Sequence, residues 1–249
     1  MTRALIKAWP ALAATAFALA IWQAIVTLSG VPRFILPAPA LVAETWWTNR
    51  WVIAEHAWIT AVEVFLGLGI GALVGVATAI QLATSRYARL LVQPVLVFTQ
   101  ALPVFALAPI LTLWLGFGLS SKVLMCVLIV YFPVAASFLD GLLRTPPGYL
   151  DLARTMQARP GQVLWRIRVP AALPSLASGL RLAAVYAPIG AVIGEWVGAS
   201  RGLGYLMLLA NGRSKTDLMF AALLTLGVFS VLLHLGVRAL TRRMVREEV

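Results

Sequence analysis

The chain has 249 residues, of which 61% are hydrophobic, and it carries a formal net charge of +11 at pH 7. Only 12% of its residues are charged, whereas soluble proteins carry about 25%. So little polar surface excludes a basic, soluble nucleic-acid-binding protein and predicts an integral membrane protein, in which basic residues gather on the cytoplasmic side.

The N-terminal segment is apolar from residue 9 to residue 29 and follows a basic start. A basic start and the Ala-Leu-Ala sequence at 18–20 are also typical of a cleavable signal peptide. The apolar stretch is too long for that alternative, so we expect it to remain as a transmembrane anchor. We assign residues 1–58 to this anchor helix and an outer loop, and residues 59–249 to a core transmembrane domain.

Six stretches are long and apolar enough to cross a bilayer, which takes about 20 residues of helix. They predict an all-α integral membrane fold with about six transmembrane helices, near residues 9–29, 59–82, 88–116, 122–142, 175–198 and 218–238. The even number of spans places both chain ends on the same side of the membrane.

The second span carries Gly67, Gly71 and Gly75 on one helix face. Helices in lipid associate through close contacts between small residues rather than through hydrophobic burial. This face is therefore predicted to pack on a neighbouring helix. The pattern leaves open whether that helix belongs to this chain or to another.

Three prolines, Pro94, Pro103 and Pro109, interrupt the third span and are expected to break it. Broken helices occur at membrane depth where protein or a watery cavity satisfies the freed backbone groups. Residues 98–109 are therefore a candidate lining of a transport path, with Gln100 as their most polar side chain. A kinked but well-packed helix is the alternative.

The basic residues predict the orientation of the chain. With a cytoplasmic N-terminus, fourteen of the 20 Lys and Arg residues fall on the cytoplasmic side, and six, among them Lys122, fall outside. This distribution is the expected excess of positive charge inside. Both termini and residues 143–174 are then predicted to be cytoplasmic.

Four ionisable residues lie near membrane depth, namely Glu63, Asp140, Glu195 and His234. Such groups are rare in spans and are functional candidates by default. We expect Glu63 to point toward the outer interface, and Asp140 and Glu195 to lie near span ends. The sequence favours structural roles for these residues without deciding their function.

The sequence contains no metal-ligand cluster, no nucleophile elbow and no Walker A loop, since residues 212–216 lack the spacing that cradles phosphate. The single cysteine, Cys126, allows no intrachain disulfide. We therefore predict a non-catalytic chain without metal or cofactor. If ATP drives the chain, another subunit must hydrolyse it.

The polar stretch between the fourth and fifth spans predicts two short helices. Asp151 is expected in the first turn of one helix, where its charge suits the helix dipole, and Pro160 is expected to start the other. Pro170 and Pro174 are expected to end the helical run before the fifth span. The apolar residues within the stretch are typical of a docking element rather than a solvated linker.

This stretch resembles the EAA loop of ABC importer permeases of the binding-protein-dependent type. Asp151, Leu152 and Ala153 stand at the Glu-Ala-Ala positions, Gln157 at the glycine, Ile167 at the isoleucine, and Val169 and Pro170 at the final Leu-Pro. Glutamine in place of glycine predicts a looser turn. The resemblance implies a type I ABC importer permease fold whose loop is a coupling helix on the ATPase subunit. The implied coupling residues are Asp151, Leu152, Ala153, Met156, Gln157, Ala158, Ile167 and Pro170.

The resemblance also implies alternating access by a homodimer of permeases in the bacterial plasma (inner) membrane. Two ATPase subunits would move the coupling helices. An extracytoplasmic solute-binding protein would deliver the solute to the outer segment 199–216, which carries Arg201, Arg213 and Lys215. A solvated loop is the alternative explanation of those charges.

Segments 34–42, 100–122 and 194–224 resemble the permease subgroup for nitrate, sulfonate, taurine and thiamine precursors. The last segment is most similar to permeases for hydroxymethylpyrimidine-type thiamine precursors. Such a pyrimidine is the expected solute, with sulfonate, taurine or nitrate as alternatives. The expected path wall includes Gln100, Pro103 and Tyr186. An ATP-independent secondary transporter, a membrane-embedded enzyme and a scaffold subunit are the competing functions.

Overall fold

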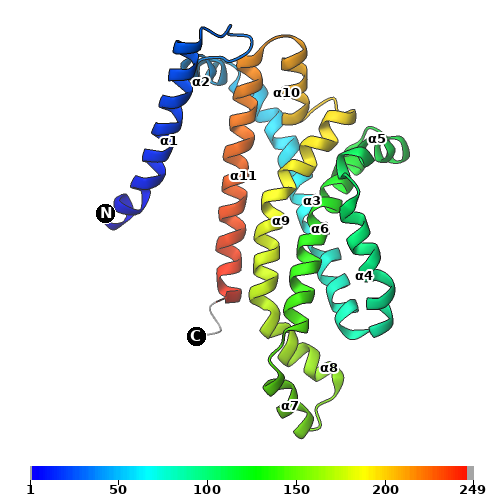
Figure 1. The fold of residues 1–249 in the computed structure, drawn as a ribbon. Helices are drawn as coiled ribbons and strands as arrows, with labels where there is room; N and C mark the ends of the chain where they lie inside the picture. Colours follow the sequence, from blue (N-terminus) through cyan, green and yellow to red (C-terminus); the bar gives the residue numbers. More distant parts are fainter. Residues whose placement is uncertain (1, 246–249) are drawn as a thin grey trace.

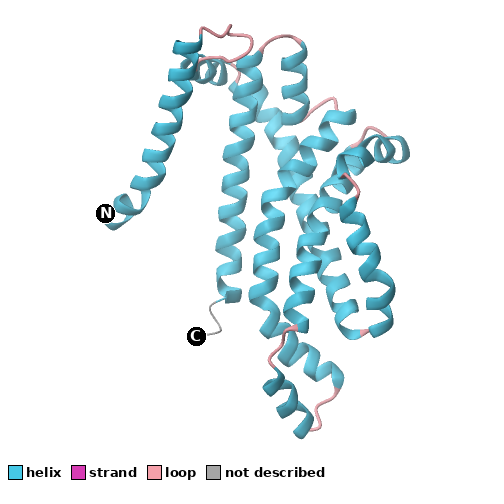
Figure 2. Ribbon diagram, viewed as in Figure 1, coloured by secondary structure: helices cyan, strands magenta, loops and turns pink. Residues whose placement is uncertain are grey.

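The computed structural model describes the backbone of residues 2–245 and, within it, all side chains except those of residues 2–8, 11, 12, 97, 100, 101 and 243. The regular elements of this part of the chain are helices joined by short turns (Figure 2). The prediction of an all-α fold is confirmed.

The long helices run along one axis of the molecule, and two short helices project from one end (Figure 1). In chain order the helices are α1 (Thr2–Ser29), α2 (Pro39–Thr48), α3 (Arg50–Thr84), α4 (Arg86–Ala101), α5 (Val104–Leu115), α6 (Leu119–Leu143), α7 (Pro147–Thr155), α8 (Pro160–Val163), α9 (Val169–Gly198), α10 (Leu203–Gly212) and α11 (Thr216–Val245). A π-helical turn, η1 (Leu164–Arg168), joins α8 directly to α9. We name the two ends of the molecule the α7–α8 end and the α2–α10 end.

Within the described residues, four helices are long and apolar enough to cross a membrane. They are Arg50–Thr84, Leu119–Leu143, Pro160–Gly198 and Thr216–Arg242. These helices contain the second, fourth, fifth and sixth predicted spans. The first predicted span lies in α1, whose described apolar part, Ala13–Ser29, is shorter.

The third predicted span consists of two helices, α4 and α5, which are separated at Leu102 and Pro103. Pro103 therefore interrupts the helix as predicted. Pro94 and Pro109 do not, because they lie inside α4 and α5. A proline removes one backbone N–H donor and therefore one helical hydrogen bond. A helix can continue despite that loss where the chain does not have to change direction.

α3, α6 and α9 form the centre of the fold and pack side by side (Figure 1). Gly67, Gly71 and Gly75 of α3 all face α6. A Cβ atom at Gly75 would lie 2.8 Å from the carbonyl oxygen of Tyr131, so a larger residue does not fit unless the backbone moves. The glycine face of α3 thus packs on a helix of the same chain, which the sequence had left open.

The contact between α6 and α9 also depends on small residues. A Cβ atom at Gly179 would lie 2.8 Å from the carbonyl oxygen of Pro133, and one at Gly190 would lie 2.8 Å from the Cα atom of Cys126. The two glycines are 11 residues apart, which is about three helical turns, so they lie on one face of α9. The sequence analysis did not identify this second close interface.

α1 extends away from α11 and approaches the rest of the chain through α2 (Figure 1). The Trp22 indole N–H donates to the carbonyl oxygen of Pro37 at 3.1 Å, and the Trp46 indole N–H of α2 donates to Thr225 Oγ1 at 2.9 Å. Residues 50–58 are the first turns of α3 rather than an outer loop, since no proline or glycine interrupts them. The division into an anchor, 1–58, and a core, 59–249, stays a prediction.

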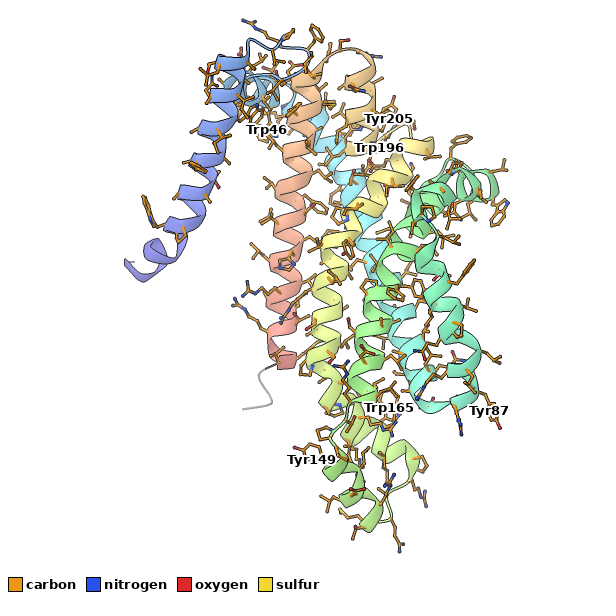
Figure 3. The ribbon with its side chains drawn as sticks, in the orientation of Figure 1. Trp46, Tyr87, Tyr149, Trp165, Trp196 and Tyr205 are labelled. Carbon is orange, nitrogen blue, oxygen red and sulfur yellow. The ribbon has the colours of Figure 1, made fainter. Side chains whose placement is uncertain are left out.

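Aromatic side chains lie at both ends of the long helices. Figure 3 places Trp46, Trp196 and Tyr205 toward the α2–α10 end, and Tyr87, Tyr149 and Trp165 toward the α7–α8 end. Trp and Tyr are enriched where membrane proteins meet the lipid headgroups. Their arrangement agrees with helices that span a bilayer between these two ends.

Candidate functional site

α7 and α8 form a compact unit at the α7–α8 end, and we call residues 147–163 the knuckle (Figure 1). α7 begins at Pro147, where the missing backbone N–H costs nothing. Asp151 therefore lies in the second turn of α7 and not in the first, as had been predicted. Its Oδ1 atom is 3.1 Å from Nη1 of Arg154, but both side chains are exposed, so the pair adds little stability.

The knuckle turns at Gln157, whose φ of +52° is left-handed. The N–H of Gln157 donates to the Arg154 carbonyl, and the N–H of Ala158 donates to the Ala153 carbonyl, each at 2.9 Å. These two bonds make the Schellman motif that closes many helices. The expectation of a looser turn is wrong, because glutamine adopts the glycine-like conformation at a cost of about 1–2 kcal/mol.

The predicted coupling residues of α7 differ in exposure. Met156 is 73% exposed and Leu152 is 59% exposed. They are four residues apart, so they lie on the same side of the helix end and present an apolar surface. Ala153 is only 4% exposed and is buried within the chain itself. The knuckle therefore has an inner residue that holds it together and outer residues that are free to contact a partner.

The second helix of the knuckle starts at Pro160, as predicted. The Gln162 side-chain oxygen accepts a hydrogen bond from the backbone N–H of Arg159 at 2.9 Å, which fixes this start. The helical run does not end at Pro170 or Pro174, contrary to the prediction, because η1 leads into α9. A π turn shifts the hydrogen-bond register by one residue, and this shift accommodates a proline that has no N–H to donate.

Two grooves flank the knuckle. The larger, of about 470 Å³, lies between the knuckle and the end of α3, and its lining includes Ala158 and Arg168. The smaller, of about 310 Å³, is lined in part by Tyr149, Ile167 and Pro170. Ala158, Ile167 and Pro170, three of the predicted coupling residues, thus line grooves beside the knuckle.

The predicted path residues lie on different elements. Pro103 precedes α5 and is exposed, and Tyr186 is exposed in the middle of α9. The side chain of Gln100 in α4 lies outside the described part of the structure. Leu182 and Ile189 are exposed on the same side of α9 as Tyr186. An apolar face of this central helix is therefore left uncovered by the described part of the chain.

A second polar site lies near the α2–α10 end, where side chains from α3, α6 and α9 meet. Glu63 of α3 and Glu195 of α9 are each 1% exposed. The Nζ atom of Lys122 in α6 lies 3.6 Å from Glu63 Oε1, and Thr60 Oγ1 donates to Glu195 Oε1 at 2.6 Å. We call these four residues the Glu195 cluster.

The cluster corrects one prediction and refines another. Glu63 does not point toward the outer interface but into the helix core, because it faces α6 and α9. Lys122, which was predicted at the outer end of the fourth span, lies in the first turn of α6 and is buried beside Glu63. Glu195 lies near the end of α9, as predicted, and Asp140 is exposed near the end of α6.

The cluster also fixes the start of α10. The backbone N–H of Gly202 donates to His56 Nδ1 at 2.9 Å, that of Leu203 donates to Thr60 Oγ1 at 2.8 Å, and that of Gly204 donates to Glu195 Oε2. The first N–H groups of a helix have no partner within it, and its positive end favours a carboxylate. The sequence analysis missed this role of Glu195.

Only glycine fits at position 202. Its φ is +111°, and a Cβ atom there would collide with the Glu195 carboxyl group. The sequence does contain a signal for this arrangement, namely a glutamate followed within nine residues by two glycines around Leu203. That signal gives no indication of the partners Thr60 and His56 on α3.

Comparison with known proteins gives the chain a family. Residues 67–246 match the family described as "Binding-protein-dependent transport system inner membrane component". A probable ABC transporter permease of Haemophilus influenzae is 48% identical over 91% of this chain and 93% of its own length. The riboflavin transport system permease RibX of Chloroflexus aurantiacus is 37% identical, over 96% and 91%. The formylaminopyrimidine transport permease ThiX of Halalkalibacterium halodurans is 34% identical, over 85% of each chain.

A solved structure shares the fold. The MetNI methionine ABC transporter, in an inward-facing conformation, aligns with a TM-score of 0.69 and 21% identity over 80% of this chain and 99% of the other. The fold is therefore that of a type I ABC importer permease, as the sequence predicted. On these grounds the chain belongs to the binding-protein-dependent transport system inner membrane components, and it is a multi-pass permease subunit of an ABC importer.

Proposed function

We propose that this permease imports a thiamine-precursor pyrimidine of the hydroxymethylpyrimidine type. Residues 194–224 resemble permeases for such solutes, and the chain is 34% identical to the formylaminopyrimidine permease. A flavin is the second candidate, because the riboflavin permease is 37% identical over 96% of this chain. Both solutes are nitrogen heterocycles, which distinguishes them from sulfonate, taurine and nitrate.

The knuckle is the docking element for a separate ATPase subunit in this proposal. This proposal is supported by the turn at Gln157, which is closed by its own hydrogen bonds and lies next to the exposed side chains of Leu152 and Met156. Energetic coupling travels through packed, rigid elements. Because η1 joins the knuckle to α9 without a loop, a displacement of the knuckle is transmitted directly to a central helix.

The α7–α8 end faces the cytoplasm in this proposal. Arg144, Arg159 and Arg166 lie around the knuckle. Arg238 and Arg242 lie in the last turns of α11, whose end points the same way as the knuckle (Figure 1). An excess of arginine on one side is typical of the cytoplasmic side. Both chain termini are then cytoplasmic, and the α2–α10 end faces outward from the bacterial plasma membrane.

The assembled importer contains two copies of this permease, two ATPase subunits and a solute-binding protein. The binding protein docks at the α2–α10 end, where Arg201, Arg213 and Lys215 are exposed. Tyr186 lies on the uncovered face of α9 and, with Pro103, lines the path between the two copies. The permease itself hydrolyses no ATP.

Uptake into proteoliposomes tests the proposal. The permease is reconstituted with its ATPase and its binding protein, and uptake of labelled hydroxymethylpyrimidine, riboflavin, taurine and an aliphatic sulfonate is measured with and without ATP. ATP-dependent uptake of the pyrimidine is the expected result. Uptake of riboflavin but not of the pyrimidine supports the second candidate. Solute accumulation by the permease alone, without ATPase or ATP, contradicts an ATP-driven role.

A further inference from the structure

The larger groove beside the knuckle contains a basic side chain. Its volume is about 470 Å³, and residues of α3, the knuckle and η1 line it, among them Thr84, Gly161 and Arg168. No aspartate or glutamate of the described chain belongs to this lining, whereas Arg168 always carries a positive charge. The groove therefore favours an anionic occupant.

Arg168 lacks the acceptor that a buried guanidinium nitrogen requires. Its Nε atom is buried and has no hydrogen-bond partner within the part of the chain that the structure describes. The two ion pairs in that part join Lys122 to Glu63 and Arg154 to Asp151, so neither neutralises Arg168. Buried polar groups are nearly always hydrogen-bonded, so an unpaired N–H beside a groove points to an acceptor on a bound molecule.

A second arginine adds positive charge at one wall of the groove. Nε of Arg89 donates to the Leu82 carbonyl at 3.1 Å, and Nη2 of Arg89 donates to the Ala83 carbonyl at 3.4 Å. Ala83 lines the groove. The last carbonyl groups of a helix form its negative end. Because Arg89 covers two of these carbonyl groups, the end of α3 does not repel an anion in the groove.

The groove lies where the spanning helices end and lipid headgroups begin. Thr84 is the last residue of α3, and Figure 1 shows α8 near the turn that joins α3 to α4. Tyr87 of α4 is 80% exposed and Trp165 of η1 is 59% exposed, and both lie at the α7–α8 end (Figure 3). Tyr and Trp are enriched at the level of the headgroups. An anion bound at this depth is within reach of the phosphate groups of the bilayer.

The surface next to the groove suits an amphiphile rather than a small, free anion. α4 follows α3 directly, and its first turns expose Leu90 and Leu91, which are 64% and 73% exposed. A phosphate in the groove therefore has apolar side chains nearby for the acyl chains that it carries. Basic pockets between spanning helices are a recognised kind of site for anionic headgroups.

The surface proposed for the ATPase is a different part of the knuckle. Leu152 and Met156 belong to α7 and its end, and neither lines this groove. The knuckle residues that do line it, Ala158, Pro160, Gly161 and Val163, belong to the turn after α7 and to α8. This separation favours a lipid over an acidic side chain of the ATPase as the occupant.

We propose that this groove binds the phosphate of an anionic phospholipid. The Arg168 guanidinium donates to a phosphate oxygen, and Arg89 adds positive charge at the wall. Arginine suits this role because its N–H groups match the geometry of phosphate oxygens. The bound headgroup joins the end of α3 to η1, which continues into α9. This inference depends neither on the solute nor on the ATPase.

Thermal unfolding of the purified, full-length permease in lipid nanodiscs tests the proposal. Nanodiscs of phosphatidylcholine are compared with nanodiscs in which phosphatidylglycerol replaces part of this lipid. The wild-type unfolding temperature should rise with phosphatidylglycerol, because a ligand that binds only the folded state stabilises it. The Arg168→Gln variant should lose this rise. Arg166→Gln removes the same charge from the same turn but at the other groove, so this matched control should keep the rise.

A second variant leaves Arg168 unchanged. Gly161 lines the groove, and apart from adjacent residues in the chain no described atom lies within 4 Å of the position that a Cβ atom would take. Gly161→Leu can therefore fold while its side chain occupies the groove. Titration with phosphatidylglycerol, followed by native mass spectrometry, measures the affinity. Both Gly161→Leu and Arg168→Gln should bind this lipid about tenfold more weakly than the wild type.

Three results overturn the proposal. Equal stabilisation of the wild type and both variants by phosphatidylglycerol would mean that this lipid acts outside the groove. Equal stabilisation of the wild type by inorganic phosphate in phosphatidylcholine nanodiscs would assign the groove to a free phosphate. No effect of phosphatidylglycerol on the wild type, together with weaker binding of the purified ATPase to Arg168→Gln, would assign the groove to a carboxylate of the ATPase. Should Arg168→Gln fail to fold, Gly161→Leu decides the first of these tests.

Discussion

Two regions at opposite ends of the molecule hold their shape by different means. The knuckle is stabilised by hydrogen bonds between residues at most five positions apart, such as the one from Ala158 to Ala153. The Glu195 cluster joins residues that are distant in sequence, with Thr60 and Glu195 135 positions apart and Gly202 and His56 146 positions apart. The knuckle is therefore a local structure, whereas the cluster exists only when α3, α6, α9 and α10 are assembled.

The difference corresponds to a difference in role. The knuckle exposes apolar side chains and is closed by its own hydrogen bonds, which suits the proposed docking surface. The cluster is buried and polar, and the groups that it brings together come from four helices. This arrangement suits a structural contact that holds one end of the helix bundle together. Under the proposed docking role, changes in the knuckle should alter contacts with the ATPase more than stability, and changes in the cluster should do the opposite.

The largest effect is expected for Glu195→Ala. It leaves two buried donors, Thr60 Oγ1 and the Gly204 N–H, without their acceptor, and each buried polar group left unsatisfied costs about 1–3 kcal/mol. Chemical or thermal unfolding of the permease in nanodiscs measures this loss, with Glu55→Ala as the exposed control. A variant as stable as the wild type contradicts the role of Glu195 in holding α3, α9 and α10 together.

A smaller effect is expected in the spans that connect the two regions. A Cβ atom at Gly75 meets the Tyr131 backbone oxygen at 2.8 Å, so Gly75→Ala should destabilise the protein by about 1–3 kcal/mol. Gly69→Ala is the matched control, because open space surrounds it on the same helix. It should instead stabilise α3 by about 0.5–1 kcal/mol. Equal effects of the two substitutions would disprove close packing of α3 on α6.

Met156→Asp tests the exposed apolar surface of the knuckle. It places a charge on the proposed apolar docking surface and should weaken assembly with the ATPase about tenfold or more, which corresponds to about 1.4 kcal/mol. Because Met156 is exposed, the unfolding temperature of the permease alone should not change. Binding of the purified ATPase to permease nanodiscs measures the effect, and Met156→Leu serves as the conservative control. Unchanged ATPase binding would place the docking surface elsewhere.

The smallest effect is expected for Gln157→Gly. Glycine adopts a positive φ without the steric penalty of glutamine, so the turn should gain about 1 kcal/mol. Hydrogen exchange of the Ala158 amide, which is bonded to the Ala153 carbonyl, should slow about fivefold. Gln157→Val is expected to have the opposite effect. Faster exchange in the glycine variant contradicts the left-handed conformation at this position.

The comparison also explains which predictions from the sequence succeeded. The start of α8 at Pro160, the break at Pro103 and the four long apolar helices depend on local residue properties, and these were predicted. The prediction that the helical run stops at Pro170 was wrong, because the π turn before Pro170 accommodates the missing backbone N–H. Asp151 was wrongly placed in the first turn of α7, because the helix already starts at Pro147.

The sequence by itself determined the membrane class, the helical spans and the spacing of the knuckle, because hydrophobicity and turn chemistry act between near neighbours. The tertiary structure alone decided that Ala153 faces inward while Met156 faces outward. It also decided that Glu63 and Lys122 are buried together beside Glu195. Burial and charge pairing depend on which distant helices become neighbours, and periodicity along one chain carries no information about that choice.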